Sequence, residues 1–473
     1  MRVFSQLYTA AWRRFGAGFL VAALGITLAT SCSLYRAAPL PPLAPIRTVM
    51  PATGRLDEEL TAIANPLVTV RPVRLDDGLD PDEAVLLALA LNPDLVAARD
   101  ARGEASAQLV QAGLLPNPTL AAEVAQPFGS QAAGLVTALN FGLSIDVRTI
   151  LTLPARHEAA QQNLAQVELG IAWQEWEVAQ NARLLATRLA WLQRRLQILD
   201  DEIALESDTT RALERAVSNG DATIAALGVE RAALEGFRRQ RDDLEQVAAQ
   251  TRAELIGVLG DPVGLAADVP VTAGSVAWGR PPSVDEIFAD CLSSRLDIEA
   301  LRRGYDAQEA RLRQAVIAQL PDLSIGVARQ RNESSVDFLG GLVNVGLPVF
   351  DRNQAQIALE SATRERLRHE YDARVIGTRA SLDALTRVGQ VIARRLPEIG
   401  DAIAPLRQID EAERSASDRG DADRLVYQTV RTSLVEQRLQ EAMLEQGLAE
   451  TWVGIGTACG DTGIASRLED ARS

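Results

Sequence analysis

The clearest strand pattern in this 473-residue chain runs from residue 139 to residue 147, Leu139-Asn140-Phe141-Gly142-Leu143-Ser144-Ile145-Asp146-Val147. Apolar residues occupy the odd positions and share one face of such a strand, while small or polar residues occupy the other face. This division is typical of a strand that lies between water and either lipid or a protein core.

The same pattern recurs later in the chain. It appears first at Leu323, Ile325 and Val327, and then at Val343, Val345, Leu347 and Val349. We therefore predict two pairs of short strands. Gly340-Gly341 is expected to form a turn between strands at an exposed rim.

The strand pairs belong to an internal repeat of the chain. Asp82-Glu83 recurs as Asp285-Glu286, 203 residues later, and at the same shift Asp94 meets Asp297 without a gap. Gly220-Asp221-Ala222 recurs as Gly420-Asp421-Ala422, 200 residues later. The sequence therefore predicts two repeats, residues 76–275 and 276–460, followed by a flexible tail at 461–473.

Long helices are predicted after each strand pair. No proline occurs between Pro154 and Pro262, and one apolar series within that span has spacings of 4, 3, 4, 3 and 4. The series is Leu185, Leu189, Leu192, Leu196, Leu199 and Ile203. This is the heptad spacing of a coiled coil. An uninterrupted helix from Ala155 to Glu206 would be about 75 Å long.

Proline and glycine set the remaining helix boundaries. In the first repeat, Asn92-Pro93 predicts a break within the opening helical stretch, which ends before Pro116. The long helix is expected to turn near Asn219-Gly220 and return towards Leu259-Gly260. In the second repeat, the equivalent helix runs from about residue 355 to residue 395, is interrupted by Pro397 and turns after residue 419.

The N-terminus has the features of an export signal. Arg13-Arg14 precedes an apolar run at residues 15–29 and then Thr30-Ser31-Cys32, which predicts a signal peptide at 1–31 and lipidation of Cys32. A plain cleaved signal and an N-terminal anchor helix are the alternatives. Five prolines between residues 39 and 51 predict an extended tether, within a segment at 32–75.

The two other cysteines, Cys291 and Cys459, have no metal-ligand spacing. Sequence alone leaves open whether they form a disulfide, and it favours two small buried residues.

The composition narrows the class of function. The net charge of −15 excludes a nucleic-acid partner, because a phosphate backbone needs a basic surface. The only histidines, His157 and His369, lie outside any cluster with ligand spacing, and no phosphate loop or nucleophile motif occurs. The sequence therefore predicts no metal site, no cofactor and no enzymatic activity.

Several motifs, taken in order, resemble the TolC-like outer-membrane efflux proteins. They are the stretch from Asp80 through Asn92-Pro93 to Pro116-Asn117-Pro118, the stretch from Val345 to Gln354, and the two glycine segments at Gly220 and Gly420. The resemblance covers about residues 75–460. Phe350-Asp351-Arg352-Asn353-Gln354 is similar to the branch of this family that serves heavy-metal cation efflux.

The resemblance implies a mainly α fold with membrane strands. Three identical chains would share a twelve-stranded β-barrel in the outer membrane, continued by a long α-helical coiled-coil barrel across the periplasm. The implied partners are a periplasmic adaptor, an inner-membrane pump of the resistance-nodulation-division type and outer-membrane lipid. The implied function is passive conduction of metal cations or drugs to the exterior.

In this family the periplasmic tips form a gate and bind the adaptor. The corresponding candidates here are Gly220, Asp221, Gly420, Asp421, Asp423 and Arg424. Well-studied members carry aspartates where this chain has Val426 and Thr429, so the charged constriction differs in form. Ordinary solvated charges at a helix start are the alternative interpretation of these residues.

A periplasmic coiled-coil scaffold or adaptor that never enters the membrane is the alternative function. Heptads alone fit such a protein, but the strand pairs do not. Four short strands cannot close a membrane barrel by themselves, and open strand edges cannot face lipid. Three copies would supply an even number of strands, which suits antiparallel closure.

Overall fold

The computed structural model describes residues 35–40, 67, 73, 78–129, 132, 134–260, 269–272, 279–418 and 424–461, without the side chains of 417, 418, 424 and 425. The chain divides into two units, Met1–Arg47 and Thr48–Ser473. Of the first unit, residues 35–40 are described, and they are exposed and lack helix or strand. The predicted signal peptide, Cys32, most of the tether and residues 462–473 lie outside the described residues.

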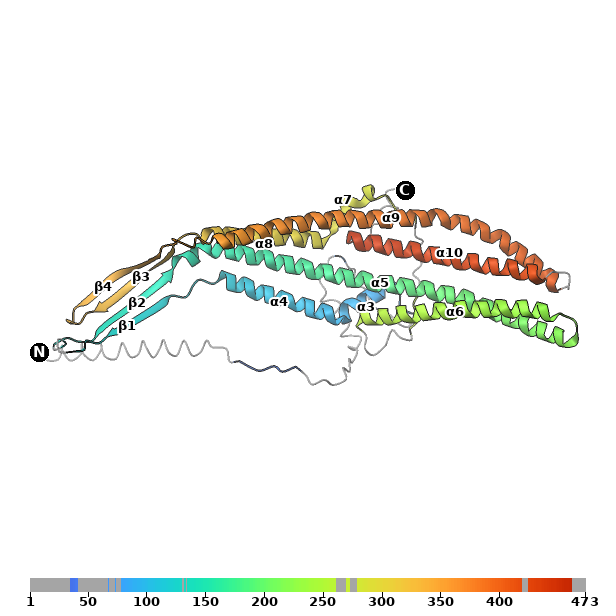
Figure 1. The fold of residues 1–473 in the computed structure, drawn as a ribbon, viewed down its shortest axis with the longest axis horizontal. Coiled ribbons are helices and arrows are strands. Elements are labelled where there is room, and N and C mark those ends of the chain that lie inside the picture. The colour runs from blue at the N-terminus through green and yellow to red at the C-terminus, as the bar shows by residue number, and fades with distance from the viewer. Residues whose placement is uncertain are drawn as a thin grey trace. The chain divides into compact units, whose positions relative to one another are not determined.

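The second unit runs twice through the order helix, helix, strand, strand, helix, helix (Figure 1). The first series is α3 (Pro81–Leu91), α4 (Pro93–Gly113), β1 (Thr119–Ala125), β2 (Ala138–Asp146), α5 (Val147–Asn219) and α6 (Ile224–Leu259). The second is α7 (Val284–Ser294), α8 (Leu296–Ile317), β3 (Asp322–Arg331), β4 (Asp337–Gly346), α9 (Gln354–Asp418) and α10 (Arg424–Cys459). The sheet lies at one end of the long helices, and the α5–α6 turn lies at the other.

Side-chain caps stabilise the N-termini of the first two helices, α3 and α4. The Asp80 carboxylate accepts from the backbone N–H groups of Asp82 and Glu83, both at 2.8 Å, and Glu83 accepts from the Asp80 N–H at 3.1 Å. This is a capping box. Asn92 then caps α4, with Pro93 in the first turn, so the predicted break at Asn92-Pro93 is confirmed.

The long helices are longer than predicted. α5 has 73 residues, about 110 Å at 1.5 Å per residue, and it includes Pro154. α9 has 65 residues and includes Pro397 and Pro405, so the predicted interruption at Pro397 is wrong. Each proline removes one helical hydrogen bond. Between the two prolines, Ile399 and Ile403 are buried against Leu434 of α10, and this packing supports the helix through the missing bonds.

The heptad series forms the main core. Leu185, Leu189, Leu192 and Leu199 are buried, and Leu196 and Ile203 pack against them. The same cluster includes Phe237, Leu244 and Leu255 of α6 and Val435 and Leu439 of α10. The predicted coiled-coil seam is therefore confirmed, and it joins helices of both repeats.

The four strands form one antiparallel sheet in the order β1-β2-β3-β4. The prediction of a turn at Gly340-Gly341 is wrong, because both glycines lie inside β4, opposite Ala328 and Val327. Neither glycine has a positive φ, so neither uses the freedom that suits glycine to turns. Asn332 makes the turn instead, and its side chain accepts from the N–H groups of Ser334 and Val336.

The predicted strands also extended too far at three positions. Val147 is the first residue of α5, and Leu347 and Val349 follow the end of β4. Alternation alone does not mark where the backbone leaves the sheet.

Cys291 and Cys459 form a disulfide between α7 and the last residue of α10. The interpretation that favoured two separate buried cysteines is therefore wrong. Both residues are buried, in a cluster with Trp452 and Ile455.

Candidate functional site

One face of the sheet, here called the apolar face, carries cross-strand rows of aliphatic side chains. The register places Leu120, Leu143 and Val327 in one row, Ile145, Ile325 and Val343 in the next, and Leu323 and Val345 in a third. Six of these eight are exposed, including Leu120 at 66% and Val327 at 59%. An exposed apolar patch of this kind marks a surface that meets lipid or another protein.

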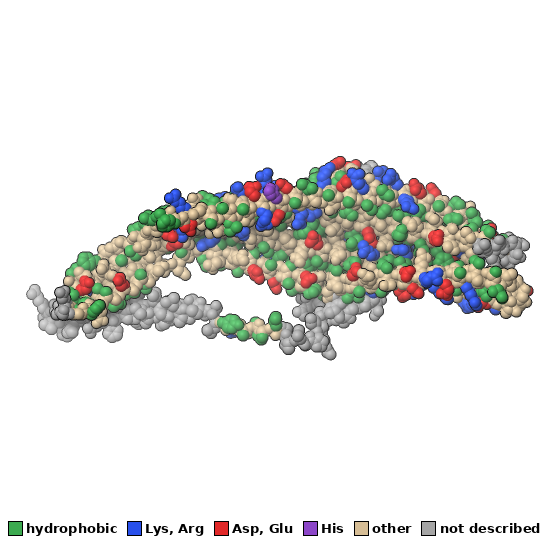
Figure 2. Space-filling model, viewed as in Figure 1, with side chains coloured by type: hydrophobic (Ala, Val, Ile, Leu, Met, Phe, Trp, Pro, Cys, Tyr) green, Lys and Arg blue, Asp and Glu red, His purple; other side chains and the backbone are tan. Residues whose placement is uncertain are grey.

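Charged groups lie at both ends of the apolar rows. Arg329 pairs with Asp337 at 3.4 Å near the β3–β4 turn, and Arg148 at the start of α5 pairs with Asp322 at the start of β3. Figure 2 shows hydrophobic side chains over the sheet, and acidic and basic side chains spread along the helices. The strands have 7 to 10 residues, close to the 9–11 that a tilted strand needs to cross a bilayer.

The opposite face of the sheet is mainly polar or small. It carries Asn140, Gly142 and Ser144 of β2 and Ser324 and Gln330 of β3. Asn140 donates to Glu123 of β1 at 3.1 Å across this face. Leu342 and Phe338 of β4 are apolar exceptions.

The sheet has two edges. Among the described residues, β1 pairs only with β2 and β4 pairs only with β3. Each outer edge therefore presents backbone N–H and C=O groups that can pair with a strand of another chain.

The structure shows half of the predicted tip residues. Gly220 caps α5 in the left-handed region at φ 83°, where glycine has no steric penalty, and the Asp221 N–H donates to the Ala216 carbonyl at 2.8 Å. Asp221 is exposed. Gly420, Asp421 and Asp423 lie outside the described residues, and Arg424 is the first residue of α10 without a described side chain.

A buried polar cluster near the hairpin ends was not predicted. This tip network consists of the buried Glu202 and Glu206 of α5, Glu230 of α6, Asp410 of α9 and Gln428 of α10, together with the partly buried Arg431 of α10. Arg431 donates to both carboxylate oxygens of Glu202, at 2.8 and 2.7 Å, and to Asp410 at 2.8 Å. Gln428 Nε2 donates to Glu206 at 3.1 Å and to Glu230 at 2.7 Å.

Burial controls the protonation of this network. Burial, a hydrogen bond to Glu230 and the charge of Glu230 together raise the pKa of Glu206 to about 8. Burial acts to lower the pKa of the Arg431 guanidinium, but the hydrogen bond and charge of Glu202 outweigh it and raise that pKa.

One sequence signal points to part of the tip network. The heptad spacing continues past Ile203 to Glu206, Thr210 and Leu213, and all three are buried. A carboxylic acid at a seam position is the detectable sign, because that position faces the partner helix. Nothing in the sequence pairs Glu206 with Gln428, which is 222 residues away.

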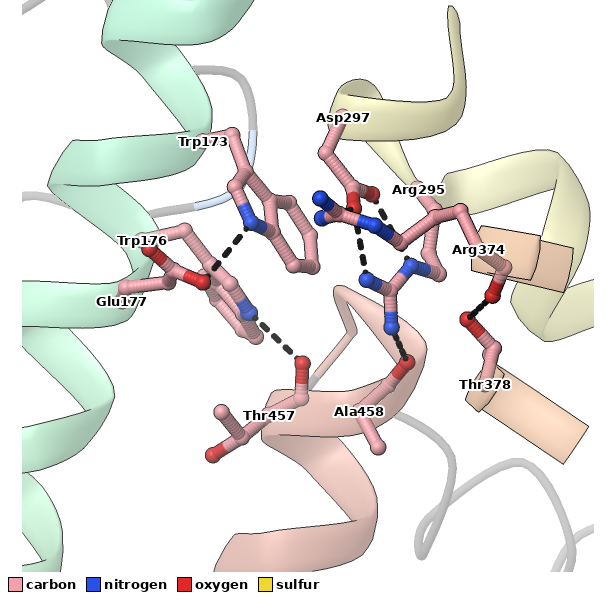
Figure 3. A network of polar contacts seen from close by, with 9 residues as sticks. All are labelled: Trp173, Trp176, Glu177, Arg295, Asp297, Arg374, Thr378, Thr457 and Ala458. Atoms are coloured by element: carbon pink, nitrogen blue, oxygen red, sulfur yellow. Dashed lines mark hydrogen bonds and ion pairs between the residues drawn. The ribbon is translucent and has the colours of Figure 1, made fainter. Parts of the chain in front are cut away.

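A second polar network lies where α5, α8, α9 and α10 meet (Figure 3). The Arg295 guanidinium donates to both oxygens of Asp297, at 2.9 and 2.7 Å, and to the Ala458 carbonyl at 2.7 Å. It lies 4.5 Å from the centroid of the Trp173 ring, a cation–π contact. Arg374 also binds Asp297, at 2.6 Å.

The first repeat makes a related contact with different chemistry. Asn92 stands 203 residues before Arg295, and its side chain donates to the Val258 carbonyl at 2.8 Å. Val258 stands 200 residues before Ala458. In both repeats, the residue at the helix break therefore binds the end of the returning helix.

Two further features bear on function. Across the described ranges, His, Cys, Asp and Glu side chains form no group of three or more suited to a metal ion. No helix in the part of the chain that the structure describes is long and apolar enough to cross a membrane.

Comparison with protein-family models found no match, and neither did comparison with curated protein sequences. Solved structures do match. VceC, an outer membrane protein of Vibrio cholerae, aligns with TM-score 0.67 and 15% identity over 80% of this chain and 96% of VceC. The CmeC outer membrane channel of Campylobacter jejuni aligns with TM-score 0.67 and 15% identity over 88% of this chain and 94% of CmeC.

The open state of the MtrE outer membrane channel of Neisseria gonorrhoeae gives a TM-score of 0.65 and 15% identity, over 84% of this chain and 94% of MtrE. At such low identity these matches establish the fold. The prediction of a TolC-like fold, mainly α with a small antiparallel sheet, is therefore confirmed: the chain has the fold of these outer-membrane channels.

Proposed function

We propose that three copies of this chain form a passive channel in the bacterial outer membrane, as the outer component of a tripartite efflux system. The observation that carries this proposal is the sheet, which has an exposed apolar face, a mainly polar face and two edges for pairing with other chains. In a closed barrel the apolar face meets lipid and the polar face lines a water-filled lumen.

Closure of the barrel explains why more than one chain is needed. An open strand edge in lipid leaves backbone groups without hydrogen bonds, at a cost of several kcal/mol per group. Pairing β4 of one chain with β1 of the next removes both edges. Three copies give twelve antiparallel strands, and the helices then continue the duct into the periplasm. The length of α5, about 110 Å, suits a conduit.

The tips are proposed to gate the duct and to bind a periplasmic adaptor, which joins it to an inner-membrane pump of the resistance-nodulation-division type. Gly220-Asp221 and the segment at residues 420–424 are the candidate tip residues. Metal cations and drugs are the candidate cargo, conducted without chelation. The pump, a separate protein, selects the substrate.

Cys32 is proposed to anchor the chain to the outer membrane through lipid. Replacing Cys32 with alanine should abolish labelling by radioactive palmitate, while Cys291→Ala should leave labelling unchanged. Persistent labelling of the Cys32→Ala variant would refute the anchor.

Two neighbouring substitutions test the channel. Leu143→Arg places a charge on the apolar face, at a cost of about 2–4 kcal/mol if that face is at the bilayer midplane. Ser144→Arg places the same charge on the polar face. We expect Leu143→Arg to lose membrane-inserted trimer and Ser144→Arg to retain it, as measured by membrane fractionation and by mass in detergent.

Equal recovery of both variants in the membrane fraction would contradict this orientation of the sheet. Recovery of the wild-type chain as a soluble monomer after detergent removal would favour the alternative, a periplasmic scaffold or adaptor.

A further inference from the structure

The carboxyl groups of Glu206 and Glu230 meet inside the tip network. Both residues are 2% exposed, and both accept from the same Gln428 side-chain amide, itself 4% exposed. Glu206 belongs to α5, Glu230 to α6 and Gln428 to α10. This contact therefore ties the hairpin of the first repeat to a helix of the second.

A proton is needed to hold this arrangement together. Glu206 and Glu230 both accept from Gln428 Nε2, at 3.1 and 2.7 Å, and the buried Oε1 atom of Glu230 has no hydrogen-bond donor among the described residues. Two ionised carboxylates have no hydrogen to share with each other. Two adjacent buried negative charges also repel strongly. The contact is consistent with a Glu206 O–H that donates to the Glu230 carboxylate while Gln428 donates to both residues.

The surrounding charges do not remove this need. The charged and titratable groups near the pair are Glu202 of α5, Asp410 of α9, and Tyr427 and Arg431 of α10, and the exposed Arg414 of α9 acts on Tyr427. Arg431 is already bound by Glu202 and Asp410. Glu202 acts in the same direction as burial and disfavours a charge on Glu206.

The position of the pair relates it to the candidate gate. Glu206 precedes Gly220 by 14 residues, about 20 Å along α5, and Glu230 follows Gly220 by 10 residues. A change in the contact between α10 and the α5–α6 hairpin therefore acts on the two helices that carry the turn at Gly220.

We propose that the proton shared by Glu206 and Glu230, held in place by Gln428, is a latch that fastens the α5–α6 hairpin to α10 and opens when alkaline pH removes the proton. Loss of the proton leaves two buried carboxylates with one amide between them, and separation of the helices lets water solvate both. The effect of the latch on conduction rests on the proposed channel function, whereas its effect on stability does not.

The sign of the pH dependence follows from the raised pKa of Glu206. Folded protein keeps this proton up to about pH 8, whereas the unfolded chain loses it near its ordinary value of 4.5. Stability from this group is thus fully present below pH 4.5, falls as pH rises and is fully lost above the folded pKa.

The test compares thermal unfolding of detergent-purified wild-type protein and three variants from about pH 6 to about pH 9.5. Glu206→Gln keeps an N–H donor towards Glu230 but has no proton to lose. Glu230→Gln removes the negative partner and lets Glu206 ionise at lower pH. Glu235→Gln is the matched control, an exposed α6 glutamate that pairs with Arg238 at 2.7 Å.

The wild type and Glu235→Gln should lose thermal stability as pH rises, with the loss levelling off near pH 8. Glu206→Gln should lack this component, and in Glu230→Gln it should move to lower pH. Identical profiles for all four proteins would overturn the latch, as would an unshifted profile in Glu230→Gln.

Single-channel recording separates the latch from the channel function. We expect the open probability of wild-type channels to rise above about pH 8 and that of Glu206→Gln to stay constant. Conducting wild-type and Glu206→Gln channels with the same pH response would overturn the role of the latch in gating. A protein that shows the thermal signature but never conducts would support the latch and overturn the proposed channel.

Discussion

Cys291 of α7 and Cys459 of α10 are joined by a disulfide that closes a chain segment of 168 residues. Its neighbours strengthen the same junction, because Arg295 donates to the carbonyl of Ala458, the residue before Cys459. The start of the second repeat is therefore fastened to its end by a covalent bond and by a buried ion-pair network.

Replacing both cysteines with alanine should lower the free energy of unfolding by about 2–4 kcal/mol, because the unfolded chain regains the entropy of a long closed loop. Thermal unfolding in detergent, with and without reductant, measures the effect. Reductant should lower the midpoint of the wild type and leave that of the double variant unchanged. A double variant as stable as the oxidised wild type would contradict this role.

Asn92→Ala should lower the free energy of unfolding by about 1–3 kcal/mol, because it removes both the cap of α4 and the hydrogen bond to Val258. Asn92→Ser separates the two effects, since serine caps a helix but is too short to reach the Val258 carbonyl. Its midpoint should lie between those of wild type and Asn92→Ala. If the serine and alanine variants unfold alike, the cap contributes nothing.

Arg431→Met should destabilise the protein by about 3–5 kcal/mol, because Glu202 and Asp410 stay buried without their counter-charge. Arg238→Met is the control, an exposed arginine in an i,i+3 pair whose loss costs about 0–1 kcal/mol. Chemical unfolding followed by helical circular dichroism measures both variants. Equal effects would show that the buried network adds no stability.

Gly326→Ala should disturb the sheet, whereas Gly340→Ala should not. A methyl group at Gly326 would collide with the Leu143 carbonyl oxygen and lie 2.8 Å from the Ser144 Cα, so β2 or β3 must shift. A methyl group at Gly340 meets no atom within 4 Å. We expect Gly326→Ala alone to lower the free energy of unfolding, by about 1–3 kcal/mol, and to reduce the yield of trimer. Wild-type yields from both variants would contradict the pairing of Gly326 with Ser144.

Local patterns predicted much of the fold. Alternation found the two-faced strands around Leu143 and Val327, heptad spacing found the seam at Leu185–Ile203, and Asn92-Pro93 marked a helix break. These features depend on residues close in sequence. The predicted helix break at Pro397 was wrong because the free-energy cost of a proline inside a helix is outweighed by the packing of Ile399 and Ile403 on α10. The sequence does not show this packing.

The functional residues were harder to predict. The resemblance to TolC-like proteins placed the periplasmic tips at Gly220 and Gly420, and the structure describes only Gly220. Glu206 lies at a seam position, but its partners Glu230 and Gln428 come from other helices, so no local pattern joins them. Cysteine spacing likewise left the pairing of Cys291 and Cys459 open.

The most direct test of the proposed channel is single-channel recording of detergent-purified wild-type protein in planar bilayers, at about pH 9 where the latch is open. We predict a trimer that inserts and produces discrete, large conductance steps, and Leu143→Arg should produce none. Recovery of a monomer that leaves the bilayer silent under the same conditions would contradict the proposal of an outer-membrane channel.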